Sequence, residues 1–265
     1  MPGPTLNQRL EVRNCPTRPL VMYQRWENLL FLHWRFPAEE VQRTLPPGLS
    51  VDTHDGTAWV GVIPFYMRGV RPRGLPAVGS LSNFLETNVR TYVYDEWGRP
   101  GVWFYSLDCN QPVAVWLARA LMHLPYEHAA MDSAMTANGA VDYCVRRKGQ
   151  DEEARFHYPL AGEGRPAEPG TLEFFLIERY RLFSYAARRR VLFDGRVWHA
   201  PYSIRAAVAD VWSDVPLRQA GFQTGGRSPD HTCVTGPVNV QIFAPQRIKI
   251  GSAVAAFQNH FFFFR

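Results

Sequence analysis

The chain has 265 residues, of which 46% are hydrophobic and 14% aromatic, so it is long enough to bury a large core within one domain. Its net charge of +5 comes from scattered arginines and from only two lysines, Lys148 and Lys249. No stretch approaches the roughly 18 apolar residues that a membrane-spanning helix needs, and the arginines lack the aromatic–basic pattern of RNA-binding sheets. Composition therefore favours a globular domain that binds neither membrane nor nucleic acid.

The cysteines and histidines are scattered along the chain. The four cysteines form no Cys-x-x-Cys pair and the eight histidines show no His-x-x-x-His spacing, so no local metal motif is present. Glycine-rich phosphate loops are also missing from the sequence. We therefore expect neither a metal nor another cofactor. Residues 1–15 contain prolines and polar residues rather than an apolar signal core, and with unpaired cysteines this predicts a reducing, cytoplasmic location.

The N-terminal part of the chain predicts an arm, a strand and a short helix. Residues 1–17 are expected to form a loose arm before a domain that spans 18–247. The bulky run LLFLHWRF at 29–36 predicts a buried strand. Pro37 then begins a helix, PAEEVQRTL, because proline is tolerated in a first helical turn and acidic residues favour that end.

Turn residues mark the following strands. Asp55–Gly56 is a hairpin signal between strands expected at 49–52 and 57–67. Residues 68–80 are rich in Gly, Pro and Arg and are expected to form a loop. Further strands are expected at 84–94, 102–107, 171–186 and 238–243, with two or three more between 129 and 158.

The run QPVAVWLARALMHL at 111–124 has the helical period. Val113, Leu117 and Leu121 fall on one face. Asn110 precedes the run and is expected to cap the helix. This is the longest helix that the sequence predicts.

The C-terminal part is less regular. An Asp194–Gly195 turn is expected before residues 197–199, and 204–212 has the pattern of either a strand or a helix. The tail, 248–265, ends in Phe261–Phe264 and is expected to pack as a final strand or to contact another copy of the chain as a homo-oligomer. Many strands, two conspicuous helices and no βαβ alternation predict a mainly β fold, an antiparallel barrel or sandwich with flanking helices.

Several motifs, taken in order and spacing, resemble one family. They are HWRFP at 33–37, LPPGLSVDTHDGTAWVGVIPF at 45–65, FLETNVRTYVYDEWGRPGVWFYSLD at 84–108, ARALMHLPY at 118–126, LIERYRLFS at 176–184 and VWHAPY at 197–202. Each motif is modest by itself, but together they are similar to the YqjF-like family of unknown function over residues 18–247.

That family is in turn similar to acetoacetate decarboxylase. The resemblance implies a closed, cone-like β-barrel with an internal, largely apolar cavity that takes a small-molecule ligand or substrate. It also implies that Glu86 corresponds to a strand glutamate of the enzyme's cavity. Where the enzyme has a proline followed by two lysines, this chain has Pro125, Tyr126 and Glu127. Neither tyrosine nor glutamate forms a Schiff base with a ketone, so that reaction is not expected.

Polar residues alternate along the strand at 84–94. Glu86, Asn88, Arg90 and Tyr92 fall on one face because side chains alternate with a period of two. On an ordinary half-buried strand this face is wet. The barrel resemblance instead implies that it lines the cavity, where Glu86 and Arg90 would form a buried, mutually paired couple that holds a polar ligand or a proton.

Three further residues are candidates for the cavity. In the strand expected at 171–186, Glu178 and Tyr180 interrupt an otherwise apolar face. Glu178 is either a structural partner of a helix arginine such as Arg119 or a general acid or base facing the cavity. His199 is either a residue of the cavity rim or a core histidine bonded to the backbone. Arg119 and Tyr126, at the end of the long helix, are expected to close the cavity.

Two functions remain open on this evidence. In the first, an enzyme performs acid–base chemistry on a small carbonyl or carboxylate compound: Arg90 holds the anion, Glu86 or Glu178 moves a proton and Tyr126 donates to an oxyanion. In the second, the same groups form a structural network in a non-catalytic binding or sensing module. A third, an interaction scaffold, uses the aromatic tail 248–265.

Overall fold

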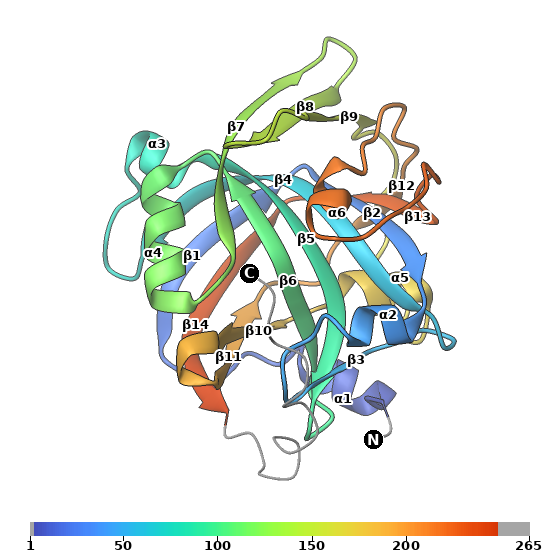
Figure 1. Cartoon of the computed structure of the whole chain (residues 1–265). Helices are drawn as coiled ribbons and strands as arrows, with labels where there is room; N and C mark the ends of the chain where they lie inside the picture. Colours follow the sequence, from blue (N-terminus) through green and yellow to red (C-terminus); the bar gives the residue numbers. More distant parts are fainter. Residues whose placement is uncertain (1–2, 249–265) are drawn as a thin grey trace.

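The computed structural model describes residues 3–248 and is built mainly from strands (Figure 1). The strands are β1 Leu20–Glu27, β2 Leu29–Phe36, β3 Leu49–Val51, β4 Ala58–Pro72, β5 Phe84–Asp95, β6 Pro100–Cys109, β7 Tyr126–Met135, β8 Ala140–Arg147, β9 Ala154–Pro159, β10 Arg181–Ala186, β11 Val191–Trp198, β12 Ile204–Ala206, β13 His231–Thr235 and β14 Val238–Ile248. The helices are α1 Leu6–Glu11, α2 Ala38–Gln42, α3 Gly79–Ser82, α4 Pro112–Met122, α5 Leu172–Ile177 and α6 Val215–Gln219, with a 3-10 turn, η1, at Ala187–Arg189.

Seven strands pair into a ring. The order β4–β1–β14–β11–β10–β6 is closed by β5, which pairs with both β4 and β6. The remaining strands extend the sheet beyond the ring, and β7, β8 and β9 project from one end of it (Figure 1). The predicted mainly β fold with flanking helices is confirmed.

The sheet is mixed, whereas an antiparallel sheet was expected. β6 pairs in parallel with β10, at Val102↔Leu182, and with β7, at Leu107↔Tyr126. A parallel pair needs a crossover connection rather than a tight turn, and α4 lies in the connection between β6 and β7. The long helix therefore determines the direction of β7.

The N-terminal residues are held against the domain, in contrast to the expected loose arm. Thr5 caps α1 through a capping box with Gln8, which satisfies backbone N–H groups at the helix start. Arg9 then pairs with the buried Asp52 at 2.6 Å, and Arg13 pairs with Glu178 at 3.0 Å. These long-range contacts have no local signal in the sequence.

The prediction of one long strand at 171–186 was wrong. Residues 172–177 form helix α5, capped by Thr171, whose hydroxyl accepts from the N–H of Phe174. Four of its six residues are buried, and a short apolar run buried on most sides shows no period that separates helix from strand. The strand β10 begins only at Arg181.

Other local expectations also need correction. Asp194–Gly195 lies inside β11, and the chain reverses instead at η1, where Arg190 has φ 52°. β4 continues through the expected loop to Pro72. Asn110 does not cap α4; its side chain accepts from the N–H of Leu85 at 2.8 Å.

The helix predicted at 111–124 is present as α4, and the side chains of Val113 and Leu117 on its apolar face are exposed. Val113 is 50% and Leu117 42% accessible. Val115 is buried instead and belongs to the inner core. The predicted apolar period was real, but it did not identify which side of the helix packs on the barrel, since both sides carry apolar residues.

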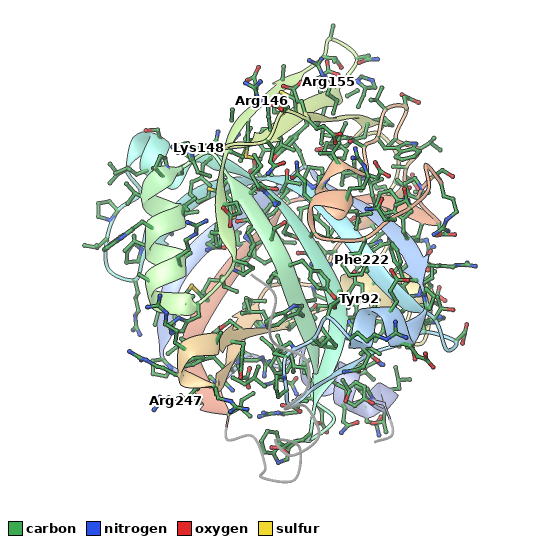
Figure 2. All side chains as sticks on the ribbon, in the orientation of Figure 1. Tyr92, Arg146, Lys148, Arg155, Phe222 and Arg247 are labelled. Atoms are coloured by element: carbon green, nitrogen blue, oxygen red, sulfur yellow. The ribbon has the colours of Figure 1, made fainter. Side chains whose placement is uncertain are left out.

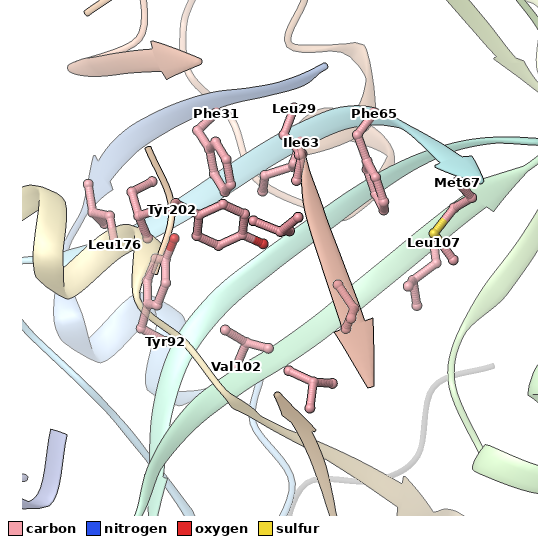
Figure 3. Close-up of a cluster of buried hydrophobic side chains, with 14 of the residues drawn as sticks. Leu29, Phe31, Ile63, Phe65, Met67, Tyr92, Val102, Leu107, Leu176 and Tyr202 are labelled. Atoms are coloured by element: carbon pink, nitrogen blue, oxygen red, sulfur yellow. The ribbon is translucent and has the colours of Figure 1, made fainter. Parts of the chain in front are cut away.

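Two hydrophobic clusters lie on opposite faces of the sheet. Figure 3 shows the inner one, in which Phe31, Tyr92 and Tyr202 gather at one end and Phe65, Met67 and Leu107 at the other. The outer cluster packs β7–β9 and α6 on the other face. No helix within residues 3–248 has the length and apolar character needed to cross a bilayer. The expected tail at 248–265, with Phe261–Phe264, lies outside the described residues except for Ile248, the last residue of β14.

Candidate functional site

The polar row of β5 points to the inside of the ring. Tyr92 belongs to the inner cluster, whereas Val89 belongs to the outer one. With a period of two, Glu86, Asn88 and Arg90 share the inner face with Tyr92. Glu86 is 3% and Asn88 5% exposed, so this face is an interior and not a wet surface.

Glu86 lies at the end of the interior near Phe65, its partner on the neighbouring strand β4. The hydroxyl of Tyr126 donates to its Oε2 at 2.7 Å. Burial raises the pKa of Glu86 to about 7, although hydrogen bonds from Tyr126 and Asn88 oppose this rise. Burial, and then the charge of Glu86, raise the pKa of Tyr126 well above its ordinary value. Glu86 can therefore gain or lose a proton near neutral pH.

The expected ion pair between Glu86 and Arg90 is not formed. Four residues along a strand span about 13 Å, so the two side chains have separate surroundings. Tyr126 contacts Glu86, and the guanidinium of Arg90 donates to the carbonyl of Leu176 at 3.1 Å. The interior thus has two polar positions, one at each end of the β5 row.

Arg90 is a cation without a carboxylate partner among residues 3–248. Its guanidinium lies 5.2 Å from the ring centre of Phe31 and 5.7 Å from that of Tyr92, in positions that favour cation–π attraction. Its Nε is buried and has no hydrogen-bond partner. Unpaired buried polar groups are rare in folded proteins and require an explanation.

His199 lies near Arg90 and also has an unpaired atom. Its ring packs on Tyr180 with a centroid separation of 4.6 Å and on Tyr202 at 4.5 Å. Nδ1 lies 2.8 Å from the carbonyl of Ala200, which requires the proton on Nδ1 and leaves a lone pair on Nε2. That Nε2 is buried without a partner. Burial, more than the nearby positive charge of Arg90, lowers the pKa of His199, so the ring is neutral.

Glu178 is fully partnered, but not by the helix arginine that was expected. Its Oε2 accepts from the hydroxyl of Tyr180 and pairs with Arg13 at 3.0 Å, and its Oε1 accepts from the N–H of Tyr202 at 3.1 Å. Such a set of donors stabilises a buried carboxylate. Glu178, which follows α5 in the chain, therefore links the N-terminal segment to the 197–202 motif.

Arg119 lies on the outside of this arrangement. It pairs with Glu127 at 2.6 Å and donates to the carbonyl of Tyr126, and its side chain is 49% exposed. It therefore anchors the start of β7 and, through the backbone, helps to position Tyr126. Among the residues that the sequence grouped with it, its hydrogen bond is to the backbone of Tyr126.

A histidine pair was missed by the sequence analysis. The Nε2 of His33 lies 2.7 Å from the hydroxyl of Tyr92, and its Nδ1 lies 3.1 Å from Nδ1 of His231. Burial, followed by the charges of His231 and Arg90, holds the pKa of His33 well below its ordinary value. His33 stands in the HWRFP motif, so the signal was present, but its partner is 198 residues away.

A cavity of 720 Å³ lies elsewhere, at the end of the ring near α1, and none of the predicted site residues lines it. Lys148, the single lysine among residues 3–248, is exposed at the turn after β8. Within the same residues no three His, Cys, Asp or Glu side chains are grouped to hold a metal ion.

Comparisons with known proteins place this chain in a family. The profile of the DUF2071 family, described as an uncharacterized conserved protein, matches residues 23–239. The uncharacterized protein YqjF of Bacillus subtilis is 36% identical over 210 residues, which are 78% of this chain and 85% of the relative. The predicted YqjF-like family is therefore confirmed.

Solved structures share the fold at low identity. The enduracididine biosynthesis enzyme MppR, complexed with pyruvate, has a TM-score of 0.59 at 13% identity and covers 89% of this chain and 92% of its own. Acetoacetate decarboxylase from Legionella pneumophila has a TM-score of 0.59 at 11% identity, with 94% and 92% covered. Since the family match spans most of the sequence, the chain belongs to the DUF2071 family and has the fold of acetoacetate decarboxylase-like proteins.

Proposed function

We propose that the interior of the barrel binds a small carboxylate compound at Arg90. The observation that carries this proposal is the guanidinium of Arg90, which, within residues 3–248, has no carboxylate partner and has a buried, unpaired Nε. A planar guanidinium matches a carboxylate through paired N–H donors. A bound carboxylate would supply both the missing counter-charge and the missing acceptor.

The surroundings of Arg90 indicate the chemical class of the ligand. Phe31, Tyr92 and Tyr202 form aromatic walls, which suit a short apolar body attached to the carboxylate. The unpaired Nε2 of His199 is a hydrogen-bond acceptor, so a hydroxyl or enol group of the ligand would pair with it. MppR, which has this fold, was solved with pyruvate, and a 2-oxo acid fits these requirements.

A second candidate function is proton transfer at Glu86, whose pKa of about 7 favours it. Because Glu86 and Arg90 lie about 13 Å apart along β5, the substrate of this reaction would be longer than pyruvate if its carboxylate bound at Arg90. A general base is most effective when its pKa is close to the working pH. Tyr126 already donates to Glu86, so we assign Tyr126 to positioning Glu86 rather than to an oxyanion. Glu178 is engaged with Arg13 and serves as a structural carboxylate.

Pyruvate binding tests the first proposal. We expect pyruvate, measured by calorimetry and thermal shift, to bind the wild-type chain and to lose binding in Arg90→Met, which keeps an unbranched apolar side chain but removes the guanidinium group. Arg71→Met is the matched control, because Arg71 also donates to a carbonyl, that of Gly69 at 3.0 Å, and lies 5.0 Å from a ring, that of Tyr23. Binding of pyruvate by Arg90→Met with wild-type affinity would overturn the proposal. So would the failure of pyruvate, 2-oxobutyrate and acetoacetate to bind at millimolar concentration.

A further inference from the structure

The cavity of 720 Å³ is separate from the Arg90 position and has a different character. It lies at the end of the ring where α1, the turn between β5 and β6, β11 and the end of β14 come together, and four arginines line it. Figure 2 labels one of them, Arg247, at the lower end of the molecule. The other three are Arg99, Arg181 and Arg196. Its volume is in the range of small-molecule sites, about 300–1,000 Å³.

One buried carboxylate, that of Asp194, forms ion pairs with several arginines at this end of the ring. Asp194 is 1% exposed, and three guanidinium groups surround it. Arg18 lies 2.8 Å and Arg99 3.6 Å from its Oδ2, and Arg181 contacts the same oxygen. Asp95 also pairs with Arg99, at 2.5 Å. Two carboxylates, Asp194 and Asp95, therefore serve three arginines, which leaves one positive charge in excess.

Within the part of the chain that the structure describes, Arg196 has no carboxylate partner. It donates only to backbone carbonyls, those of Tyr180 at 3.1 Å, Val12 at 2.7 Å and Asn14 at 3.2 Å. Burial, followed by the positive charge of Arg181, lowers the pKa of Arg196 to about 10. The repulsion between these two cations lowers the stability of the folded chain.

The lining has a net positive charge and one buried donor without a hydrogen-bond partner. Four arginines and two acids, Glu11 and Asp194, line the cavity, so its formal charge is 4 − 2 = +2. Arg181 is 6% exposed, and its Nε has no hydrogen-bond partner. An anion with several oxygen acceptors would complete both the charge and the hydrogen bonding of this site.

We propose that this cavity binds a small polyanion with at least two anionic oxygen groups, either phosphates or carboxylates. Arg181 and Arg196 are direct partners across β10 and β11, Arg247 comes from β14, and Arg99 comes from the turn between β5 and β6. Four guanidinium forks around one cavity suit a ligand with more than one anionic group. Trp97, 51% exposed at the rim, would cover an uncharged middle part.

The test uses pyrophosphate and citrate as probes, measured by isothermal calorimetry with the whole chain. We expect one of the two to bind with a stoichiometry of one, and the stronger of them identifies phosphate or carboxylate as the preferred group. Arg247→Gln should weaken binding by about tenfold, since it removes one charge-assisted contact. Arg247 is exposed, so this change leaves the fold intact.

Two controls make the result decisive. Arg155→Gln removes another exposed arginine, 75% accessible and at the opposite end of the molecule (Figure 2), and should bind like wild type. Arg90→Met should also bind like wild type, because Arg90 does not line this cavity. The proposal fails if neither probe binds, if several probe molecules bind without saturation, or if Arg247→Gln and Arg155→Gln weaken binding equally.

Discussion

The protonation of Glu86 provides a quantitative test of the barrel interior. In the folded chain its pKa is about 7, against 4.5 for the unperturbed group. Between these values the unfolded chain loses a proton that the folded chain keeps. The folded state then binds more protons, so the free energy of unfolding falls as pH rises. Below pH 4.5 both states are protonated, and Glu86 contributes no pH dependence.

The size of the effect follows from the pKa difference. A shift of 7 − 4.5 = 2.5 pH units corresponds to about 3 kcal/mol, at 1.36 kcal/mol per unit. The loss of stability is confined to the interval between pH 4.5 and 7 and is complete at higher pH. Glu86→Gln has no proton to lose and keeps an oxygen that can accept from Tyr126. We therefore expect this variant to gain about 3 kcal/mol relative to wild type between pH 4 and pH 8.

Urea denaturation of both proteins across this range measures the difference directly. Groups common to both, such as His33 and His199, cancel in the subtraction. Glu39→Gln is the matched control, because that side chain is 89% exposed and tests whether loss of any carboxylate has this effect. Parallel stability curves for wild type and Glu86→Gln would refute the buried, proton-exchanging Glu86 and remove the basis for proton transfer.

Three further predictions concern stability. Arg90→Met should leave the free energy of unfolding unchanged or raise it by about 1 kcal/mol in urea titrations, because a half-buried cation whose Nε is buried without a hydrogen-bond partner is costly. A large loss would instead indicate a structural role. Arg13→Met should lower the free energy of unfolding by about 3 kcal/mol, because it leaves the buried carboxylate of Glu178 without its counter-charge. If the pairing is correct, the double variant with Glu178→Gln should recover part of this loss. Gly61→Ala should lower the melting temperature, at a cost of about 1–3 kcal/mol, because the new Cβ would lie 2.7 Å from the ring of His33; an unchanged melting temperature would contradict the close packing at this position.

Part of the candidate site could be predicted from local pattern. The alternation along β5 requires that Glu86, Asn88, Arg90 and Tyr92 share a face, and the structure places that face inside the ring. The geometry of a strand forces this grouping whatever the rest of the fold does. The same geometry, however, separates Glu86 from Arg90 by four residues, so the expected ion pair could have been rejected from spacing alone.

The partners of the site residues could not be predicted in this way. Arg13 and Glu178 are 165 residues apart, and no periodicity relates positions at such a distance. The helix α5 is a second example. Its apolar run fits a strand equally well, and only the cap at Thr171 and burial on most sides determine the outcome.

By itself, therefore, the sequence determined the family, the mainly β class and the faces of the strands, because these depend on motifs and on the two-residue repeat of an extended chain. The closure of the ring, the parallel neighbours of β6 and the lack of a counter-charge at Arg90 were decided only by the tertiary structure. The physical reason is that the charge state and function of a buried group depend on what surrounds it in space, and in this chain those neighbours come from segments far apart in the sequence.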